Sequence, residues 1–400
     1  MNKEIVIDVK KIFTAVAFYE NNKLRELEIC NASKENILKS IYIGKVKNVI
    51  NGMNAVFVDI GIEQNAYMSY DPKREEKIKI GDELLVQVIK EPIGQKGATV
   101  TQDIKIPGRY VVLSPKDDYV GVSNKIFDEN IRNKISNLVL RKSKGYGFII
   151  RTNSMNASDE EILEEIKYLI SIWEDIQAFS KYKACYSVVY QEKSQGITLL
   201  RDMLNADISK VYINDVEYYK EVVDFVSKLN KEYVSKIILY DDKNLSLSNL
   251  FKLDGSIKKL LKEKVWLKSG ASIVIQQTEA LVSIDVNSSK NIGKKQFDKT
   301  IFEVNKEAAI EIARQVKLRN LSGIIIIDFI DMKEETNNIN LIEIFRKELK
   351  NDRVKTCVLG MTKLGLLEMT RKKTSKSLSN KITTQCSACQ GKGIVMNNLW

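Results

Sequence analysis

Two carboxylates at the ends of apolar segments are the residues of this chain best placed to do chemistry. Asp285 follows the segment 281–284, and Asp328 follows the segment 323–327. Both segments contain β-branched residues and predict buried strands. Burying two unpaired carboxylates is costly, and a hard divalent cation with oxygen ligands would relieve that cost. Asn287, two residues after Asp285, shares the same face of its strand. The three side chains form a candidate magnesium site, with the two acids as metal ligands.

The elements between the two acids favour this interpretation over a simpler one. Strand-end acids can also cap helices or pair with cations, and Lys290, Lys294 and Arg314 are near in the sequence. The segment 296–319, however, has the apolar spacing of a long helix. A strand, a helix and a second strand of this length predict a right-handed crossover, which would bring both acids to one edge of a sheet.

Composition narrows the possible chemistry. A chain of 400 residues that is 44% hydrophobic and 8% aromatic is long enough for about two to four domains. The net charge of +11 favours a polyanionic partner, although it would also serve solubility. Because the chain contains no histidine, histidine acid–base pairs, Ser-His-Asp triads and histidine metal ligands are excluded. Any catalysis must rely on carboxylates, metals or lysines.

The amino terminus and the isolated cysteines predict a cytoplasmic protein. Residues 1–8 carry an early acid and no long apolar core, and no later segment approaches the roughly 18 apolar residues of a membrane span. Cys30, Cys185 and Cys357 are far apart and do not form a secreted disulfide framework. A reducing compartment suits such thiols.

Cys386 and Cys389 have the spacing of half a zinc site. The glycines at 391 and 393 would let the backbone turn around a metal. Structural zinc takes four ligands, and no histidine exists to complete the set. We therefore predict that two chains share one zinc ion and form a symmetric dimer. The alternative is a frayed pair of thiols near the end of the chain.

The remaining segments predict an α/β chain of several units. Short strands over 4–9, 12–20 and 24–30 form a meander that is too small to stand alone. Residues 197–260 alternate helix and strand, so we expect them to pack with the meander. The residues between these two segments would then be inserted as separate units.

The segment 37–104 predicts a barrel that could bind RNA. It contains five short strands with glycines at the corners, a pattern typical of an OB-type barrel. Phe57 and Tyr67 lie on predicted strands, where their rings could stack on unpaired bases. Lysines that could contact phosphates are Lys45, Lys47 and Lys96. The alternative, that Phe57 belongs to the core and Tyr67 is merely half buried, stays open.

A strand-to-helix turn after the barrel could hold a terminal phosphate. The elements expected here are strands over 108–113 and 146–151 and a helix over 159–179. Ser158 predicts the helix N-cap, and Glu161 would complete a capping box. Arg151 and Thr152 lie at the turn, where a guanidinium, a hydroxyl and free amides could converge on a phosphate. The simpler alternative is that both side chains are solvated.

Five motifs in order give the chain a close resemblance to the ribonuclease E/G family. They are Ser-Ile-Asp-Val-Asn-Ser at 283–288, Glu-Ala-Ala-Ile-Glu-Ile-Ala-Arg-Gln at 307–315, Gly-Ile-Ile-Ile-Ile-Asp-Phe-Ile-Asp-Met at 323–332, Leu-Gly-Leu-Leu-Glu-Met-Thr-Arg at 364–371 and the terminal Cys-x-x-Cys-x-Gly-x-Gly. The resemblance covers nearly the whole chain.

The resemblance implies a multidomain α/β fold. An RNase H-like fold would be formed by 1–35 and 197–260, interrupted by an S1 RNA-binding barrel and a 5′-sensor region, and followed by a DNase I-like catalytic subdomain and a zinc-link. The inserted and following parts would be 36–104 for the S1 domain, 105–196 for the 5′-sensor region, 261–383 for the catalytic subdomain and 384–400 for the zinc-link.

The resemblance also implies roles for single residues. Asp285 and Asp328 match the magnesium-binding catalytic acids, and Asn287 would orient the attacking water or contact the scissile phosphate. The implied RNA contacts are Phe57, Tyr67 and Lys96, and the implied 5′-monophosphate pocket is Val112, Arg151 and Thr152. Tyr67 stands where the family has phenylalanine, which should still allow stacking. Asn124 and Lys125 replace a more basic arginine pair, so phosphate contacts are not carried over to them.

The implied activity is Mg²⁺-dependent endonucleolytic cleavage of single-stranded, A/U-rich RNA, stimulated by a 5′-monophosphate. The products would carry 5′-phosphate and 3′-hydroxyl ends, and the substrates would be rRNA and tRNA precursors and mRNA. Because the chain ends at Trp400, soon after the cysteine pair, we expect a short form of the family. The alternative function is that of a non-catalytic, ribosome-associated RNA-binding protein that relies on its S1 barrel.

Overall fold

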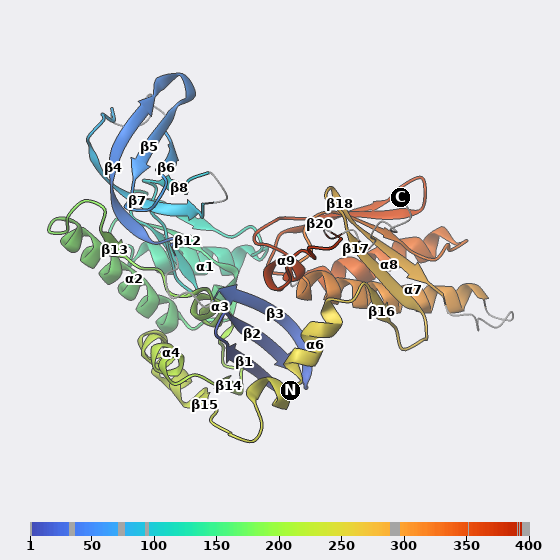
Figure 1. The fold of residues 1–400 in the computed structure, drawn as a ribbon. Helices are drawn as coiled ribbons and strands as arrows, with labels where there is room; N and C mark the ends of the chain where they lie inside the picture. Colours follow the sequence, from blue (N-terminus) through green and yellow to red (C-terminus); the bar gives the residue numbers. More distant parts are fainter. Residues whose placement is uncertain are drawn as a thin grey trace. The chain divides into compact units, whose positions relative to one another are not determined.

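The computed structural model describes residues 2–31, 37–70, 77–92, 96–288, 297–350, 352–389, 391 and 393 (Figure 1). Its contacts divide the chain into two compact units. The first unit comprises Met1–Cys30, Asp207–Val216 and Ile238–Trp400, and the second comprises Asn31–Ala206 and Glu217–Ile237. None of the helices in the described ranges has the length and apolar character that a bilayer-spanning segment needs.

The first unit contains a five-stranded sheet whose strands come from two distant parts of the sequence, 3–31 and 210–239. The strand order is β15-β14-β1-β2-β3, with β1 parallel to β14 and antiparallel to β2. The strands are β1 (Lys3–Val9), β2 (Phe13–Glu20), β3 (Lys23–Asn31), β14 (Lys210–Ile213) and β15 (Ile237–Leu239). The pairing expected between the amino-terminal meander and the later α/β segment is therefore present. Three short helices contribute to its core, namely α5 (Leu247–Leu250), α6 (Leu253–Leu260) and α9 (Leu378–Ile382).

A six-stranded sheet forms the other half of the first unit. Its order is β16-β17-β18-β19-β21-β20, and within it β18 and β19 are parallel neighbours. The strands are β16 (Lys264–Trp266), β17 (Ser272–Gln277), β18 (Leu281–Asn287), β19 (Gly323–Asp328), β20 (Thr356–Met361) and β21 (Leu366–Arg371). The helix α7 (Phe297–Leu318) is the predicted crossover between β18 and β19. A parallel pair requires such a connection, because a short turn cannot reverse the chain twice.

Among the described residues, helices cover one face of the six-stranded sheet. Apolar residues of α7 and α8 (Glu335–Leu349) share one core with alternate residues of the central strands, and Figure 1 shows both helices beside the sheet. In β18 the side chains at 282, 284 and 286 are buried, whereas those at 285 and 287 are exposed. This alternation is the period of two that a half-covered strand requires. We call the uncovered side the open face of this sheet.

The second unit contains the predicted barrel. Five strands run in the order β4-β5-β6-β8-β7, and pairing of β4 with β7 closes the barrel. They are β4 (Ile41–Ile50), β5 (Ala55–Asp59), β6 (Ala66–Ser69), β7 (Glu83–Lys90) and β8 (Thr99–Thr101). Gly44 allows the tight approach of β4 and β5, since a Cβ at this position would lie 2.5 Å from the Val58 side chain. A short strand, β13 (Val188–Tyr190), adds to the outer edge of β4.

A four-stranded sheet beside the barrel carries two helices in the same unit. Its order is β11-β12-β10-β9, and α1 and α2 share its apolar core. The elements are β9 (Ile106–Pro107), β10 (Val111–Ser114), β11 (Val120–Val122), α1 (Glu129–Leu140), β12 (Gly147–Ile150) and α2 (Asp159–Ser180), followed by α3 (Gln195–Met203) and α4 (Val216–Leu229). The predicted capping box of Ser158 and Glu161 is confirmed, with both reciprocal hydrogen bonds formed.

The strand expected over 108–113 is wrong in its first half. Residues 106–107 and 111–114 form separate antiparallel strands, and the Gly108 N–H donates to the Val111 carbonyl at 2.8 Å to close the turn. The physical reason is Glu165 on α2. Its buried carboxylate accepts from the N–H groups of Arg109, Tyr110 and Val111 at 2.5, 2.7 and 2.9 Å. A side chain on Gly108 would meet this carboxylate, because a Cβ would lie 2.5 Å from its carbon.

Candidate active site

The two predicted acids lie side by side on the open face. Asp285 on β18 and Asp328 on β19 are register partners across the parallel pair, and both side chains are exposed. Asn287 lies two residues further along β18 and donates its amide Nδ2–H to Asp285 Oδ2 at 2.5 Å. The sheet therefore brings together all three residues that the sequence analysis grouped. Their proximity follows from the crossover through α7, which makes the two strands parallel and so brings their carboxyl ends to the same edge of the sheet.

The electrostatics of the pair favour a cation. Partial burial raises the pKa of Asp328, and the negative charges of Asp285 and Asp331 raise it further by smaller amounts. In the described ranges neither acid of the pair forms an ion pair with a lysine or arginine. Arg314, one of the neutralising partners considered above, instead pairs with Glu311 at 2.9 Å. Lys290 and Lys294 lie outside the described residues.

The donor set of the pair suits magnesium. Within the described residues no group of three or more histidines, cysteines or acids is close enough to enclose a metal. One or two carboxylates are nevertheless what Mg²⁺ commonly takes from a protein, since it retains waters and binds substrate phosphates. Asn287 uses its amide nitrogen toward Asp285, which orients its oxygen away from that contact. Asp285 and Asp328 could thus hold Mg²⁺ on a surface that remains open to a phosphodiester.

The predicted base-stacking residues are neighbours on the barrel. Phe57 on β5 and Tyr67 on β6 are cross-strand partners, and their ring centroids lie 6.1 Å apart in an edge-to-face arrangement. Tyr67 is 37% exposed and Phe57 is half buried, so neither ring belongs fully to the core. Lys96 is exposed. Lys47 forms an ion pair with Asp59 at 3.4 Å, a pairing that a phosphate would have to compete with.

Arg151 lies where the sequence predicts it, but it already has an acidic partner. It follows β12, and its guanidinium donates two hydrogen bonds to the Asp202 carboxylate at 2.9 and 2.8 Å and a third to the Gly108 carbonyl at 2.5 Å. Thr152 lies beside it, with its hydroxyl 3.3 Å from that of Ser123. Val112 is half buried on the neighbouring strand β10. The two parallel hydrogen bonds from Arg151 to Asp202 use the pair of guanidinium N–H groups that can also bind a phosphate. We call this pair of donors the Arg151 fork.

Asp202 is the residue of this region that sequence reasoning missed. Burial alone would raise its pKa, but hydrogen bonding to Arg151 and the charges of Arg201 and Arg151 hold the pKa below the usual value. The available signal was local, because Arg201 is a charged residue on the otherwise apolar buried face of α3 and Asp202 is the next residue in the chain. Their partners, however, come from segments about fifty residues or more away in the chain, which no local pattern reveals.

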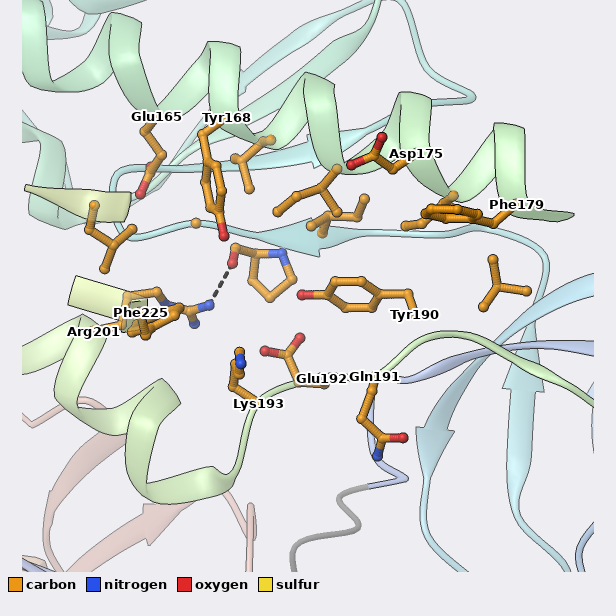
Figure 2. Close-up of a pocket in the computed structure, with 18 residues that line it drawn as sticks. Glu165, Tyr168, Asp175, Phe179, Tyr190, Gln191, Glu192, Lys193, Arg201 and Phe225 are labelled. Carbon is orange, nitrogen blue, oxygen red and sulfur yellow. Dashed lines mark hydrogen bonds between the residues drawn. The ribbon is translucent and has the colours of Figure 1, made fainter. Parts of the chain in front are cut away.

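A cavity of about 240 Å³ adjoins this network (Figure 2). Figure 2 shows Tyr168 and Glu165 of α2 facing Tyr190, Glu192 and Arg201 across it. Arg201 donates to the Pro107 carbonyl at 2.6 Å and to Asp202 at 3.1 Å, which links the cavity wall to the Arg151 pair. Glu192 is only 4% exposed, and its Oε2 has no hydrogen-bond partner in the described structure. Burial accordingly raises the pKa of Glu192.

The cysteine pair near the end of the chain gathers hydrogen-bond donors around one sulfur. Hydrogen bonds from the backbone of Cys389 and Ala388, and then from the Cys389 side chain, lower the pKa of the Cys386 thiol. Donors aimed at one sulfur favour the thiolate, which is the form that binds zinc. All five cysteines are unbridged, and among the described residues no third ligand joins the pair. Within the described ranges the pair therefore offers two ligands.

An OB-like barrel combined with a paired-acid site is an arrangement typical of nucleic-acid-cleaving enzymes. Comparison with known proteins gives the family. A model of the Ribonuclease E/G family matches residues 105–374. Ribonuclease G of Escherichia coli (strain K12) is 35% identical over 415 positions, which cover 99% of this chain and 85% of that protein. Ribonuclease G of Haemophilus influenzae is 36% identical, with 98% and 84% covered. Ribonuclease E of a Nostoc species is 33% identical, with 98% and 59% covered.

The chain belongs to the ribonuclease E/G family. This confirms the resemblance drawn from the five sequence motifs.

Proposed function

We propose that this endoribonuclease hydrolyses phosphodiester bonds of single-stranded RNA with Mg²⁺ held by Asp285 and Asp328. The observation that carries the proposal is the register pairing of the two acids across β18 and β19, with no neutralising cation among the described residues. Bound Mg²⁺ would supply Lewis-acid polarisation of the phosphate and would acidify a water molecule. The expected products carry 5′-phosphate and 3′-hydroxyl ends.

Asn287 would act beside the acids rather than in place of one. Its hydrogen bond to Asp285 fixes the orientation of that carboxylate. An oriented carboxylate loses less freedom when the substrate arrives, which is how outer partners of a metal ligand contribute to catalysis. The amide could also donate to the scissile phosphate or to the attacking water. A route through a cyclic phosphate with paired histidines is excluded, since the chain has no histidine.

The barrel is proposed to act as an S1 domain that holds the RNA strand. Phe57 and Tyr67 would stack on unpaired bases, and Lys96 would contact a phosphate. On the same proposal, the five-stranded sheet is the RNase H-like part, and the six-stranded sheet with α7 and α8 is the DNase I-like catalytic part. The domain limits given in the sequence analysis remain a proposal in this form.

Arg151, Thr152 and Val112 are proposed to favour RNA with a 5′-monophosphate. The supporting observation is the guanidinium fork, which is formed and oriented before any ligand arrives. A phosphate would replace the Asp202 carboxylate or share Arg151 with it, so end recognition in this chain depends on that exchange. We further propose that the substrates are A/U-rich segments of rRNA and tRNA precursors and of mRNA in the cytoplasm.

Two chains are proposed to share one zinc ion through Cys386 and Cys389. The supporting observation is the cluster of donors at the Cys386 sulfur. Zinc content of the purified protein provides the test. About half an equivalent of zinc per chain is expected, lost together with the dimer in Cys389→Ser. A full equivalent per chain in a monomer would contradict the shared site.

The catalytic proposal is tested by cleavage of a single-stranded A/U-rich RNA with and without Mg²⁺. Substrates with a 5′-monophosphate and a 5′-hydroxyl are compared, and Asp328→Asn is expected to abolish cleavage of both. The matched control is Asp241→Asn, an exposed acid of the same unit that lies outside the site. Cleavage that persists in Asp328→Asn would show that the reaction runs elsewhere in the molecule.

A further inference from the structure

An exposed tryptophan lies on the same sheet face as the catalytic acids. Trp266 is on the edge strand β16, and its side chain is 68% exposed. It is the register partner of Ser272 on β17, which is in turn the partner of Asn287 on β18. Register partners in neighbouring strands project to the same side of a sheet. Trp266 therefore stands on the open face, in one row with Asn287.

A lysine accompanies the tryptophan in the adjacent row. Lys264 is the register partner of Val274, and the row continues through Asp285 to Asp328. The Lys264 Nζ lies 4.2 Å from the centroid of the Trp266 ring, which is within the range of a cation–π contact. The contact steadies the indole in its outward position. One row of register partners therefore connects Lys264 with Asp285 and Asp328. The adjacent row connects Trp266 with Asn287.

The spacing suits a nucleotide next to the bond that is cut. Two strand spacings separate Trp266 from Asn287, a distance of about 10 Å along the sheet. A scissile phosphate held at Asp285 and Asp328 would place the base of a flanking nucleotide within reach of the indole. Large exposed aromatic rings are the platforms on which single-stranded nucleic acids stack, because every base has a π-face. An ammonium beside such a ring adds attraction for the adjoining phosphate.

We propose that Trp266 and Lys264 form a nucleobase subsite on the catalytic face, with Trp266 stacking on a base that flanks the scissile phosphate and Lys264 contacting the neighbouring phosphate. The inference rests on the proposed RNA cleavage at Asp285 and Asp328. It adds a second stacking surface to the one on the barrel. Its position on the catalytic sheet itself would fix the register of the strand at the cut.

The test combines a protein change with a substrate change. Cleavage of a single-stranded RNA is measured for wild type, Trp266→Ala and Trp266→Phe, with the natural base or an abasic site at each position around the cut. Trp266→Ala is expected to lower kcat/KM about tenfold on the full substrate, and Trp266→Phe to recover most of it. One abasic position close to the cut should lower wild-type cleavage similarly and abolish the difference between the variants. The matched control is Tyr182→Ala, an aromatic residue that is 89% exposed elsewhere.

A merely structural role predicts a different result. If Trp266→Ala loses the same factor on every abasic substrate as on the full one, no base meets the indole and the proposal fails. An unchanged kcat/KM also overturns it, and an altered oligomeric state with unchanged cleavage would identify Trp266 as a subunit contact. For Lys264→Gln the salt dependence of RNA binding should weaken by about 0.7 in the log–log slope, the value of one phosphate contact on a single strand.

A binding readout keeps the inference separate from the proposed catalysis. Tryptophan fluorescence is titrated with single-stranded RNA in metal-free buffer, where no cleavage occurs. The wild-type signal is expected to fall on binding, and Trp266→Phe is expected to lose that change although Trp173 and Trp400 remain. Absence of RNA cleavage by wild type would refute the proposed function. Absence of the fluorescence change would refute the subsite, whichever result the cleavage assay gives.

Discussion

The acid pair on the open face and the Arg151 fork in the second unit differ in whether a side chain of opposite charge neutralises them. Asp285 and Asp328 face each other without a neutralising side chain among the described residues, so their negative charges must be compensated from outside. Arg151 has its compensation within the chain, in the bidentate contact with Asp202. The first site is incomplete without a ligand, whereas the second is complete without one. Removing a charge should therefore abolish function at the first site and alter stability at the second.

The largest effect is expected from Asp285→Asn. Loss of a proposed direct metal ligand should lower cleavage by more than about a hundredfold, since even outer partners of a metal ligand contribute 10- to 100-fold. RNA affinity in metal-free buffer should stay nearly unchanged, because the barrel does not depend on this acid. Cleavage rates and filter-binding affinities measured on the same preparation check both halves. A variant that cleaves RNA within tenfold of the wild-type rate would show that cleavage does not depend on Asp285.

Asn287→Ala should give an intermediate loss. The substitution deletes the hydrogen bond to Asp285 but leaves both acids, so cleavage should fall about 10- to 100-fold. Raising the Mg²⁺ concentration should recover part of the loss, because a less well-oriented carboxylate binds the ion more weakly. A magnesium titration of the cleavage rate separates the two contributions. Loss that does not respond to Mg²⁺ would instead assign Asn287 to the substrate.

Asp202→Asn tests the Arg151–Asp202 pair. It leaves the partly buried Arg151 and Arg201 without their shared carboxylate, and we expect the free energy of unfolding to fall by about 1–3 kcal/mol. At the same time the ratio of cleavage rates for 5′-monophosphate over 5′-hydroxyl RNA should rise, since on the proposed recognition by Arg151 the phosphate no longer competes with Asp202. Thermal unfolding and paired-substrate kinetics test these expectations. Unchanged stability would mean that the fork contributes nothing to the fold.

The smallest effect concerns the buried Glu192. Its raised pKa means that the folded state holds a proton that the unfolded chain releases at lower pH. The stability that this proton confers is complete below the ordinary pKa of about 4.3 and is lost as the pH rises through the higher folded value. Glu192→Gln should therefore melt a few degrees higher than wild type at pH 8, with the difference shrinking toward pH 4. A pH series of melting curves tests this, and a destabilised variant at pH 8 would contradict it.

Sequence patterns predicted the first site better than the second for a physical reason. Strand, helix and strand between 281 and 328 form one local crossover, so the two acids reach the same edge by chain geometry alone. The Ser158 capping box is likewise set by local spacing, and the single strands of the barrel by alternation and by the turns between them. The family assignment followed from the same motifs.

The features that sequence reasoning missed depend on side chains from distant segments. Asp202 meets Arg151 across 51 positions, and Glu165 binds the backbone of 109–111 across more than 50. Neither contact leaves a periodic trace in the sequence. Trp266 belongs to an edge strand of three residues, too short to show alternation. Its place opposite Ser272, and through it near Asn287, became visible only from the register of the sheet.

The parallel pairing of β18 and β19 has a consequence for how Asp285 and Asp328 respond to thermal fluctuation. Their separation is set by the ladder of backbone hydrogen bonds that joins the two central strands, over a core that includes Ile284 and Ile327. Partial opening of the molecule reaches loops and edge strands first, whereas central strands exchange their amide hydrogens only on global unfolding. The two carboxylates should therefore keep their spacing in every partly opened form, and amide exchange beside Asp285 and Asp328 should be among the slowest in the first unit.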